Sequence, residues 1–400
     1  MEIIRTFHPI GQGGFYTESF DDLPNKPMVV FDCGGTSRQS MKKYIDDFLP
    51  SNPKNPKATI EAVFISHLHD DHINGLQHLI DRANVKKIFL PQFNPNQLFE
   101  IIFYNAARGA KGSNSNQLVL SFIESNRSNH FLNEVSIIQI AEVTGDNNYQ
   151  NVTHNIQHGV SSQTIASGTS LILENKWVYI SFNPKSKAPY FDGITDQAIK
   201  ETLQSLYNNN TNLYEQAEAL AQFVESCGVE QCKELYKKMF GGIHNGQSMT
   251  LFSGLRNPNP NMEICSCPFP PTCHHYLYSH WRDWFAEFAK DNKDCIPTNF
   301  LYTGDYEVSD KLKMKELINF YKEMKVWSTI YGVQIPHHGS RKNYADELYN
   351  KRCYAIASAS SSNRYRHPNI DTLINISDQK CMPFVVTEKP KTKLVQHYKI

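Results

Sequence analysis

Residues 64 to 76 read FISHLHDDHINGL, and six consecutive positions in this stretch carry five potential metal ligands: His67, His69, Asp70, Asp71 and His72. Neutral imidazole nitrogens and carboxylate oxygens are ligands that divalent ions accept. In a strand-like loop the spacing H-x-H-x-D-H turns alternate side chains toward one ion. We therefore expect His67 and His69 to hold a first ion, and Asp71 and His72 a second, with Asp70 outside the set. The plain alternative is a group of histidines on a solvated loop.

The elements around this stretch are those of a βαβ unit. The run TIEAVFIS (59–66) is rich in apolar and β-branched residues and ends directly at His67, which predicts a buried strand with the motif in the loop at its carboxyl end. Leu76, Leu79 and Ile80 have helical spacing, and VKKIFLP (85–91) predicts the next parallel strand. The candidate ligands thus follow a strand directly.

The rest of the chain predicts an α/β protein with two interruptions. Further strands are expected at 3–7, 27–32, 169–182 (a hairpin with a Glu-Asn turn), 248–254, 299–305, 330–336, 354–360 and 383–388. Residues 98–134 are expected to be mainly helical with a break at 109–116. A helical insertion or cap is expected at 185–240 and a Pro- and Cys-containing insertion at 256–297. We expect a single domain over 1–400, with two domains as the alternative.

Composition limits the classes of partner and compartment. Lys plus Arg and Asp plus Glu number 40 each, so no global field attracts nucleic acid or anionic membrane, and an anionic substrate must be recognised locally. The first residues lack the apolar core of a signal peptide, and no stretch approaches the roughly 20 apolar residues that span a bilayer. Nine scattered cysteines favour reduced thiols over a disulfide framework. We expect a soluble cytoplasmic protein without a membrane partner.

The stretch SHLHDDH resembles the metal loop of the metallo-β-lactamase fold superfamily, and the resemblance covers most of the chain outside the two insertions. FDCGG places Asp32 in the usually structural Asp-Gly turn of that superfamily. YTGD matches its T-G-D, and GIHNGQS is similar to its G-H-x-x-G-S, with Ile243 as a departure. The resemblance implies an αββα sandwich of two mixed β-sheets with outer helices, in which His244 completes the first ion and Asp305 bridges both. His154 and His158 are rivals of His244.

Two later stretches are similar to a narrower group. IPHHGSRKN (335–343) and NRYRHP (363–368), together with GQGGF (11–15), most closely resemble the hydrolase domain of competence DNA-uptake proteins. The H-H-G-S also resembles that of a phosphorylcholine esterase. The resemblance implies that His338 binds the second ion, that His337 faces the substrate, and that His367 is either catalytic or a competitor of His338 for the metal. The alternative for His337 and His338 is a strand-end pair bonded to backbone.

These residues predict a dinuclear metal-dependent hydrolase that uses two divalent ions, zinc first and manganese second, and attacks its substrate with a metal-bridging hydroxide. Asp71 would orient or deprotonate the water, while His337 and His367 would stabilise oxyanion charge. The neighbouring arginines at 341, 364 and 366 favour an anionic substrate, either a small molecule or a nucleic acid. The first hypothesis is phosphodiester hydrolysis in nucleic acid, a nucleotide or a phospho-headgroup. Carboxyl-ester, thioester or lactone hydrolysis is the second, and a non-catalytic, metal-stabilised regulatory protein is the third.

The second insertion carries its own candidate ligands. ICSCPFPPTCHHY (264–276) offers a structural zinc site or a Pro-stiffened loop with buried thiols, through these residues: Cys265, Cys267, Cys273, His274 and His275. The aromatic spacing in WRDWFAEFAK (281–290) could stack bases, but it more often indicates a helix face packed in the core.

Overall fold

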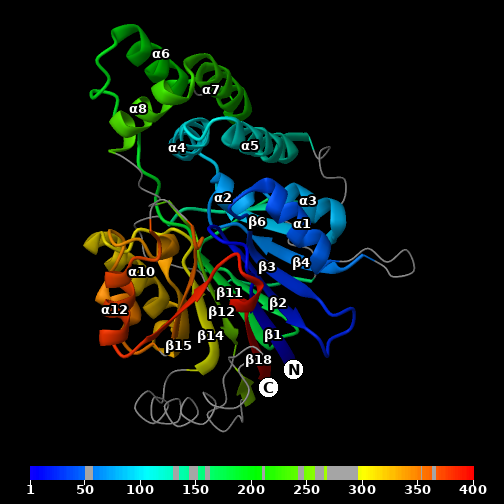
Figure 1. The fold of residues 1–400 in the computed structure, drawn as a ribbon. Coiled ribbons are helices and arrows are strands. Elements are labelled where there is room, and N and C mark those ends of the chain that lie inside the picture. Colours follow the sequence, from blue (N-terminus) through cyan, green and yellow to red (C-terminus); the bar gives the residue numbers. More distant parts are fainter. Residues whose placement is uncertain are drawn as a thin grey trace.

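The computed structural model describes most of the chain. The described residues are 1–49, 57–128, 135–143, 152–157, 163–209, 212–241, 247–256, 265–267, 296–352, 354–362 and 366–400. They form two mixed β-sheets that pack face to face, with helices outside both sheets and a group of helices beyond one end of the sandwich (Figure 1).

The first sheet has ten strands. In spatial order they are β13 (Cys265–Cys267), β18 (Leu394–Lys399), β1 (Glu2–Phe7), β2 (Phe15–Phe20), β3 (Met28–Cys33), β4 (Thr59–Phe64), β6 (Lys87–Pro91), β7 (Ser136–Ile140) and β9 (Thr164–Ile165), with β5 (Asn84–Val85) beside β4. Pairing is antiparallel from β13 to β3 and parallel from β3 to β9. The parallel part contains the predicted βαβ unit.

The second sheet has eight strands. In order they are β17 (Met382–Val386), β16 (Tyr354–Ser358), β15 (Ile330–Gln334), β14 (Ile296–Tyr302), β12 (Thr250–Leu255), β11 (Trp177–Phe182), β10 (Ser170–Leu173) and β8 (Thr153–Asn155). The strands β14 to β17 are parallel, and β10, β11, β12 and β14 are antiparallel. The predicted hairpin at 169–182 is confirmed, because Glu174 and Asn175 both have the positive φ that its tight turn requires.

The alternation of side chains along each strand sets the layers. Val30 of β3 and Val63 of β4 face the outer helices, whereas Phe31 and Phe64, one residue further on, face the second sheet. The layer between the sheets is rich in aromatic side chains, and Trp177 of β11 is fully buried there. Apolar area removed from water in this layer holds the sheets together.

Helices cover the outer faces of both sheets. On the first lie α1 (Arg38–Phe48) and α3 (Leu76–Arg82), and the single turn α2 (Asp70–Ile73) precedes α3. On the second lie α10 (Lys311–Glu323), α11 (Asp346–Tyr349) and α12 (Ile370–Asp378). Short 3₁₀ turns are η2 (Trp327–Thr329), η3 (Pro336–Gly339) and η4 (Pro390–Thr392).

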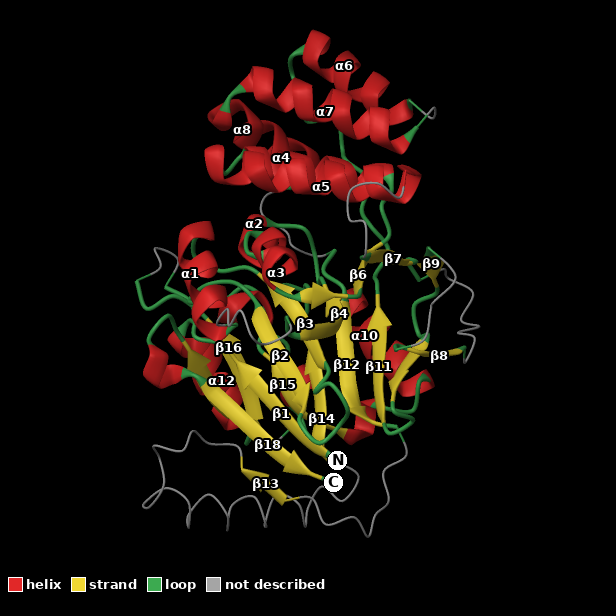
Figure 2. Cartoon of the chain, turned by 90° about the vertical axis from the view of Figure 1, so that its right-hand side faces the viewer, coloured by secondary structure: helices red, strands yellow, loops and turns green. Residues whose placement is uncertain are grey.

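Five further helices gather at one end of the sandwich, and we name them the helical cap (Figure 2). They are α4 (Pro95–Ala106), α5 (Ala110–Ser128), α6 (Gln197–Asn208), α7 (Leu213–Cys227) and α8 (Val229–Phe240). Helix α4 packs against α5, α7 and α8, so two segments far apart in sequence form one body. The cap stands directly above α2, the turn that carries Asp71 and His72.

The helical break predicted at 109–116 is shorter than expected. The chain leaves α4 at Ala107 and enters α5 at Ala110, with Gly109 at φ +72° between them. The polar residues that suggested a loop are inside α5, because Ser115 and Asn116 hydrogen-bond to Asp70 and to the carbonyl of Ile102. Tertiary partners thus compensate for their weak helical preference.

Two further predictions concern membrane spans and the second insertion. No helix within the described ranges is both long enough and apolar enough to cross a membrane. The candidate zinc ligands at 273–275 and the aromatic stretch 281–290 lie outside the described residues.

Candidate metal centre

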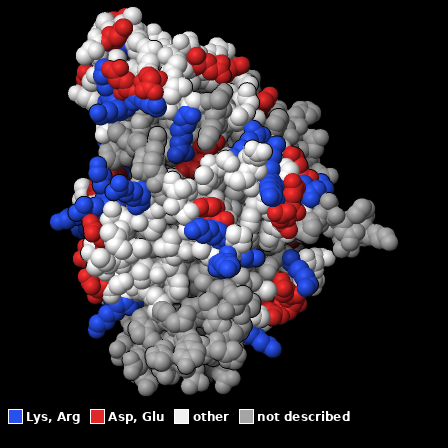
Figure 3. Space-filling model, in the orientation of Figure 1, with Lys and Arg blue, Asp and Glu red and all other residues white. Residues whose placement is uncertain are grey.

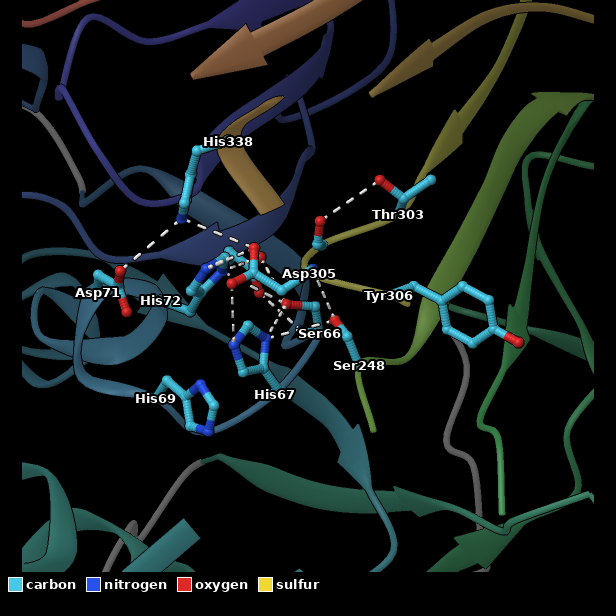
Figure 4. Close-up of polar contacts among 12 residues, drawn as sticks. Ser66, His67, His69, Asp71, His72, Ser248, Thr303, Asp305, Tyr306 and His338 are labelled. Atoms are coloured by element: carbon cyan, nitrogen blue, oxygen red, sulfur yellow. Dashed lines mark hydrogen bonds and ion pairs between the residues drawn. The ribbon is translucent and has the colours of Figure 1, made fainter. Parts of the chain in front are cut away.

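The predicted ligands come from loops that follow β4, β14 and β15 and meet at one edge of the sandwich. The loop after β4 carries His67 and His72, the loop after β14 carries Asp305, and the η3 turn after β15 carries His338. Figure 4 shows the imidazoles of these three histidines arranged around the Asp305 carboxylate. All four side chains are buried. The carboxyl ends of parallel strands therefore bring residues 271 positions apart, from 67 to 338, into one site.

The distances between these side chains are those of ligand atoms and not of hydrogen bonds. Nε2 of His67 is 3.9 Å from Oδ2 of Asp305, and Nε2 of His72 is 3.5 Å from its Oδ1. Nε2 of His338 is 3.6 Å from Oδ1 of Asp305 and 3.8 Å from Oδ2 of Asp71. Atoms bound tetrahedrally to zinc at ~2.0–2.1 Å lie about 3.3 Å apart. In the part of the chain that the structure describes, two groups of side chains have such spacing: His67, His72 and Asp305, and Asp71, His72 and His338.

The far side of two imidazole rings is occupied by an acceptor. Nδ1 of His72 lies 2.8 Å from Oδ2 of Asp32, and Nδ1 of His338 lies 2.9 Å from the carbonyl oxygen of Ser358. Because these oxygens only accept, each Nδ1 carries the hydrogen, and Nε2 is directed at the site. Among the described residues, the buried Nε2 atoms of His67, His72 and His338 have no hydrogen-bond partner. Orphaned, convergent nitrogens of this kind fit metal ions.

His69 is turned the other way from its neighbours. Its Nε2 faces the Glu100 carboxylate at 3.2 and 3.3 Å, while its buried Nδ1 lacks a partner among the described residues. The ring stacks on Tyr104 with 3.5 Å between centroids. His69 therefore offers Nδ1 as a ligand, and it lies beside His67 with ring centroids 4.3 Å apart.

Asp71 divides its two oxygens between the centre and the helical cap. Oδ2 faces His338, and Oδ1 accepts a 2.9 Å hydrogen bond from Nη1 of Arg108. Burial alone would raise the pKa of Asp71, but Arg108, His72 and His338 hold it well below its usual value. Asp71 is thus a permanent carboxylate, whereas Asp70 turns away and accepts from Ser115 at 2.9 Å.

Electrostatics favour positive charge at the centre. Burial would lower the pKa of His72, yet Asp32 and Asp305 raise it well above its ordinary value. Burial would raise the pKa of Asp305, yet His338, His337 and His72 hold it well below. The carboxylates therefore create a site that attracts cations, and a divalent ion can take the place of a proton.

A cavity of about 600 Å³ opens above these residues. Its described lining includes the carboxylates of Asp71 and Asp305 and the imidazole of His338. Further lining residues are Tyr104, Arg108, His337, Arg341, Lys342 and His367. Burial lowers the pKa of His337, and burial with the neighbouring His337 and His338 lowers that of His367 to about 4. Both imidazoles are therefore neutral at pH 7, with ring centroids 5.9 Å apart.

Part of the chain is similar to a known protein family. The family model described as "Anti-Pycsar protein Apyc1" matches residues 22–184, a segment that contains Asp32 and the H-x-H-x-D-H stretch but ends before Asp305 and His338. No curated protein matches the chain. Solved structures that resemble it include MEM-A1, a subclass B3 metallo-β-lactamase isolated from a soil metagenome library, at 12% identity over 57% of this chain and 91% of that one, with a TM-score of 0.20.

Rubredoxin oxygen:oxidoreductase from the anaerobe Desulfovibrio gigas is also similar, at 12% identity over 97% of this chain and 92% of that one, with a TM-score of 0.21. These weak likenesses say nothing of the reaction. The fold is the metallo-β-lactamase sandwich. Its two mixed sheets with outer helices confirm the fold predicted from the motifs. The matched family differs from the competence proteins, so that finer resemblance stays a prediction.

The metallo-β-lactamase sandwich brings most of the predicted site residues together. The exceptions among described residues are Arg366, which is exposed, and His154, which lies on edge strand β8 in neither ligand group. Arg341 lines the cavity, but its Nε pairs with Asp371 at 3.2 Å. The remaining predicted residues, His158, His244 and Arg364, lie outside the described residues.

Several residues that shape the centre were not predicted from the sequence. Asp32, by contrast, was predicted as a structural residue, and it accepts hydrogen bonds from the backbone N–H and hydroxyl of Ser66 at 2.7 and 2.8 Å as well as from Nδ1 of His72. Glu100, Tyr104 and Arg108 all approach the centre from one face of α4 and the turn after it. Their spacing of i, i+4 and i+8 in EIIFYNAAR was the available signal, a polar stripe on an otherwise apolar helix.

Two glycines let the chain approach Asp71 closely. A Cβ on Gly34 would lie 2.5 Å from the carbonyl carbon and oxygen of Asp71, and one on Gly13 would lie 2.4 Å from that oxygen. The sequences GQGG and FDCGG therefore pack directly against the metal loop. This contact explains why the predicted turns lie beside the site.

Proposed function

We propose that the protein is a dinuclear metal-dependent hydrolase that cleaves phosphodiester bonds. One observation carries the proposal: unpartnered imidazole nitrogens and two buried carboxylates converge at the floor of a cavity whose rim is cationic. Such a donor set suits divalent ions, and its nitrogen content favours zinc, with manganese as the alternative.

The geometry supports a division of ligands between two ions. His67 through Nε2 and His69 through Nδ1 would hold the first ion, and His244 remains the candidate for completing it. Asp71, His72 and His338 form the group that would hold the second. Asp305 lies within 4 Å of His67, His72 and His338, so its carboxylate would bridge the two ions. His338 is favoured over His367 as the ligand, because its Nε2 lies 3.6 Å from Oδ1 of Asp305 and 3.8 Å from Oδ2 of Asp71.

The side chains around the ions would each have a defined task. When bound, two divalent ions supply activated water at neutral pH and neutralise charge that develops on the substrate. Asp71 is ionised, so it can accept a proton from that water or orient it. His337 and His367 are neutral, and each can donate one N–H to a phosphate oxygen in the cavity.

The cavity supports an anionic substrate of limited size. Arg108, Arg341 and Lys342 line it. Among the described lining residues, the one acidic side chain outside the ligand set is Glu307, which is paired with Lys313 at 2.7 Å. A volume of about 600 Å³ is typical of small-molecule sites. Elsewhere, Lys and Arg are interspersed with Asp and Glu on the face seen in Figure 3, with no broad basic track for a duplex. A nucleotide-sized phosphodiester therefore fits better than a paired nucleic acid.

The test is a substrate panel on zinc- or manganese-loaded protein, with bis-p-nitrophenyl phosphate, cyclic mono- and dinucleotides, single- and double-stranded DNA, RNA, a phosphodiester headgroup, lactones and thioesters. We expect hydrolysis of at least one phosphodiester, with kcat/KM reduced by about 100-fold or more in His67→Ala and after chelation. The matched control is His78→Ala on α3, because His78 is paired with Asp46 away from the cavity. Its activity should equal that of the wild type.

Two outcomes would contradict the proposal. If no phosphodiester is cleaved, and lactone or thioester turnover disappears in His67→Ala, the site is an ester hydrolase. If protein with two bound ions turns over no substrate of the panel, a metal-stabilised regulatory role is the better account.

A further inference from the structure

Arg108 is a cation that the helical cap places in the cavity, and the proposed function uses it only as part of the cationic lining. It follows α4, its side chain is 29% exposed, and it lines the cavity with the proposed ligands Asp71 and Asp305. Its surroundings differ from those of Arg341, which is 73% exposed and is paired outside the cavity with Asp371.

Two contacts hold the Arg108 guanidinium in place. Nη1 donates to Oδ1 of Asp71 at 2.9 Å, and the guanidinium carbon lies 5.1 Å from the centre of the Tyr104 ring. Tyr104 in turn stacks on His69, so its ring contacts both the imidazole and the guanidinium beside the centre. The side chain is thus oriented before any ligand arrives, and this reduces the entropy lost on binding.

These contacts leave donors for a ligand. A guanidinium has five N–H donors, and within the described parts of the chain the bond to Asp71 is the one hydrogen bond that the Arg108 guanidinium makes. Asp71 directs Oδ2 to the metal side and Oδ1 to Arg108, so it can bind an ion and retain the arginine at once. The carboxylate also raises the pKa of Arg108 above its usual value, and the group is charged at every working pH.

We propose that Arg108 binds a non-bridging oxygen of the substrate phosphate, so that the helical cap supplies a substrate-binding residue to the metal centre. The phosphate rests on the proposed function, whereas the anion site itself rests on the geometry of Arg108. A planar guanidinium anchored at one nitrogen and open at the others is well suited to a tetrahedral oxyanion. The alternative is that Arg108 only positions Asp71.

Binding of inorganic phosphate to the zinc-loaded protein tests the proposal without turnover. Calorimetry would give the phosphate Kd, and mass spectrometry the zinc content, for the wild type, Arg108→Gln and Arg108→Lys. The matched control is Arg82→Gln, because Arg82 is 27% exposed and is paired with Asp46 outside the cavity. The kcat/KM for bis-p-nitrophenyl phosphate is measured in parallel.

We expect Arg108→Gln to keep the zinc content of the wild type and to weaken phosphate binding by about 10- to 100-fold, as for loss of a hydrogen bond to a charged group. The phosphate Kd of Arg108→Lys should lie between those of the wild type and Arg108→Gln, since lysine keeps the charge without the planar guanidinium. Arg82→Gln should match the wild type. In the turnover assay, the loss in kcat/KM should follow the loss in phosphate affinity.

Three results would overturn the inference: an unchanged phosphate Kd in Arg108→Gln, a lowered zinc content in that variant, which would make Arg108 a positioning residue for Asp71, or no phosphate binding by the zinc-loaded wild type. Failure of the proposed function gives a different pattern. In that case no phosphodiester is cleaved, but phosphate still binds and its affinity still depends on Arg108.

Discussion

At the scale of single residues, the candidate centre depends on groups behind the ligands as much as on the ligands. Asp32 fixes Nδ1 of His72, and the Ser358 carbonyl fixes Nδ1 of His338, so each Nε2 is presented to the site. The backbone is equally constrained, because His337 and His338 both adopt positive φ, at 50° and 54°. Unfavourable conformations of this kind persist where the surroundings hold them, as they do at functional sites.

The close contact between Gly34 and the metal loop gives a residue-scale prediction. Gly34→Ala places a methyl group 2.5 Å from the Asp71 backbone, so the loop that carries Asp71 and His72 must shift. We expect the free energy of unfolding to fall by about 1–3 kcal/mol and the zinc bound per chain to decrease. Urea unfolding and metal analysis measure the two effects.

The control for this substitution is Gly193→Ala, where the nearest atom to an added Cβ lies 3.3 Å away in the cap. It should leave the zinc content unchanged. A Gly34→Ala protein with wild-type stability and zinc content would contradict the packing account.

At the scale of elements, the helical cap and the sandwich meet at the centre. Helix α4 carries Glu100 to His69, and Tyr236 of α8 donates a 2.7 Å hydrogen bond to Oε1 of Glu100. The second helical segment of the cap therefore acts on the metal loop through one carboxylate. A carboxylate behind a ligand histidine fixes its tautomer and raises its basicity.

This chain of contacts predicts that Glu100 and Tyr236 tune metal affinity. Glu100→Gln should weaken zinc binding by about 10- to 100-fold, because the amide cannot hold His69 with Nδ1 free as firmly as a carboxylate does. Tyr236→Phe should have a smaller effect in the same direction. Competition with a zinc chelator measures both, with the exposed Glu230→Gln on α8 as the control. Equal zinc affinity in Glu100→Gln and the control would be inconsistent with this role.

The same element scale explains what sequence reasoning could and could not provide. Strands β4, β14 and β15 each contain a short apolar run and were predicted. The ligands at their ends followed from the H-x-H-x-D-H spacing after β4 and from the family resemblance after β14 and β15. Strand β18 was missed because one of its buried positions is the polar Gln396 and the half-buried position before it is the apolar Val395, so apolar and polar residues do not alternate regularly. Glu100 and Arg108 were missed because nothing local links α4 to the loop after β4. Their role depends on a tertiary contact.

At the scale of the whole molecule, a buried ion pair joins the two sheets. Arg5 of β1 donates to Glu18 of β2 at 2.7 Å, and both side chains are almost inaccessible to solvent. Glu18 also accepts hydrogen bonds from four side chains of the opposite sheet: Trp177, Tyr179, Ser253 and Tyr302. A charged group satisfied from both sheets specifies how they face each other.

Removing one partner of this pair should be costly. Glu18→Ala leaves a buried, uncompensated guanidinium, and we expect the free energy of unfolding to fall by about 3–5 kcal/mol. The double variant Arg5→Met with Glu18→Leu should be less destabilised than Glu18→Ala, because no charge stays buried. Urea denaturation monitored by tryptophan fluorescence compares them. If the free energy of unfolding falls by less than about 1 kcal/mol in Glu18→Ala, the pair contributes no more than a solvent-exposed ion pair, which would contradict this account.

The central claim is that distant loops of one sandwich build a site for two metal ions. The most direct test is the number of zinc ions per chain, measured by mass spectrometry after saturation with zinc and removal of the excess. The account predicts two ions in the wild type and fewer in Asp305→Ala, since Asp305 would contact both. One ion or none in the saturated wild type, or an unchanged count in Asp305→Ala, would contradict it.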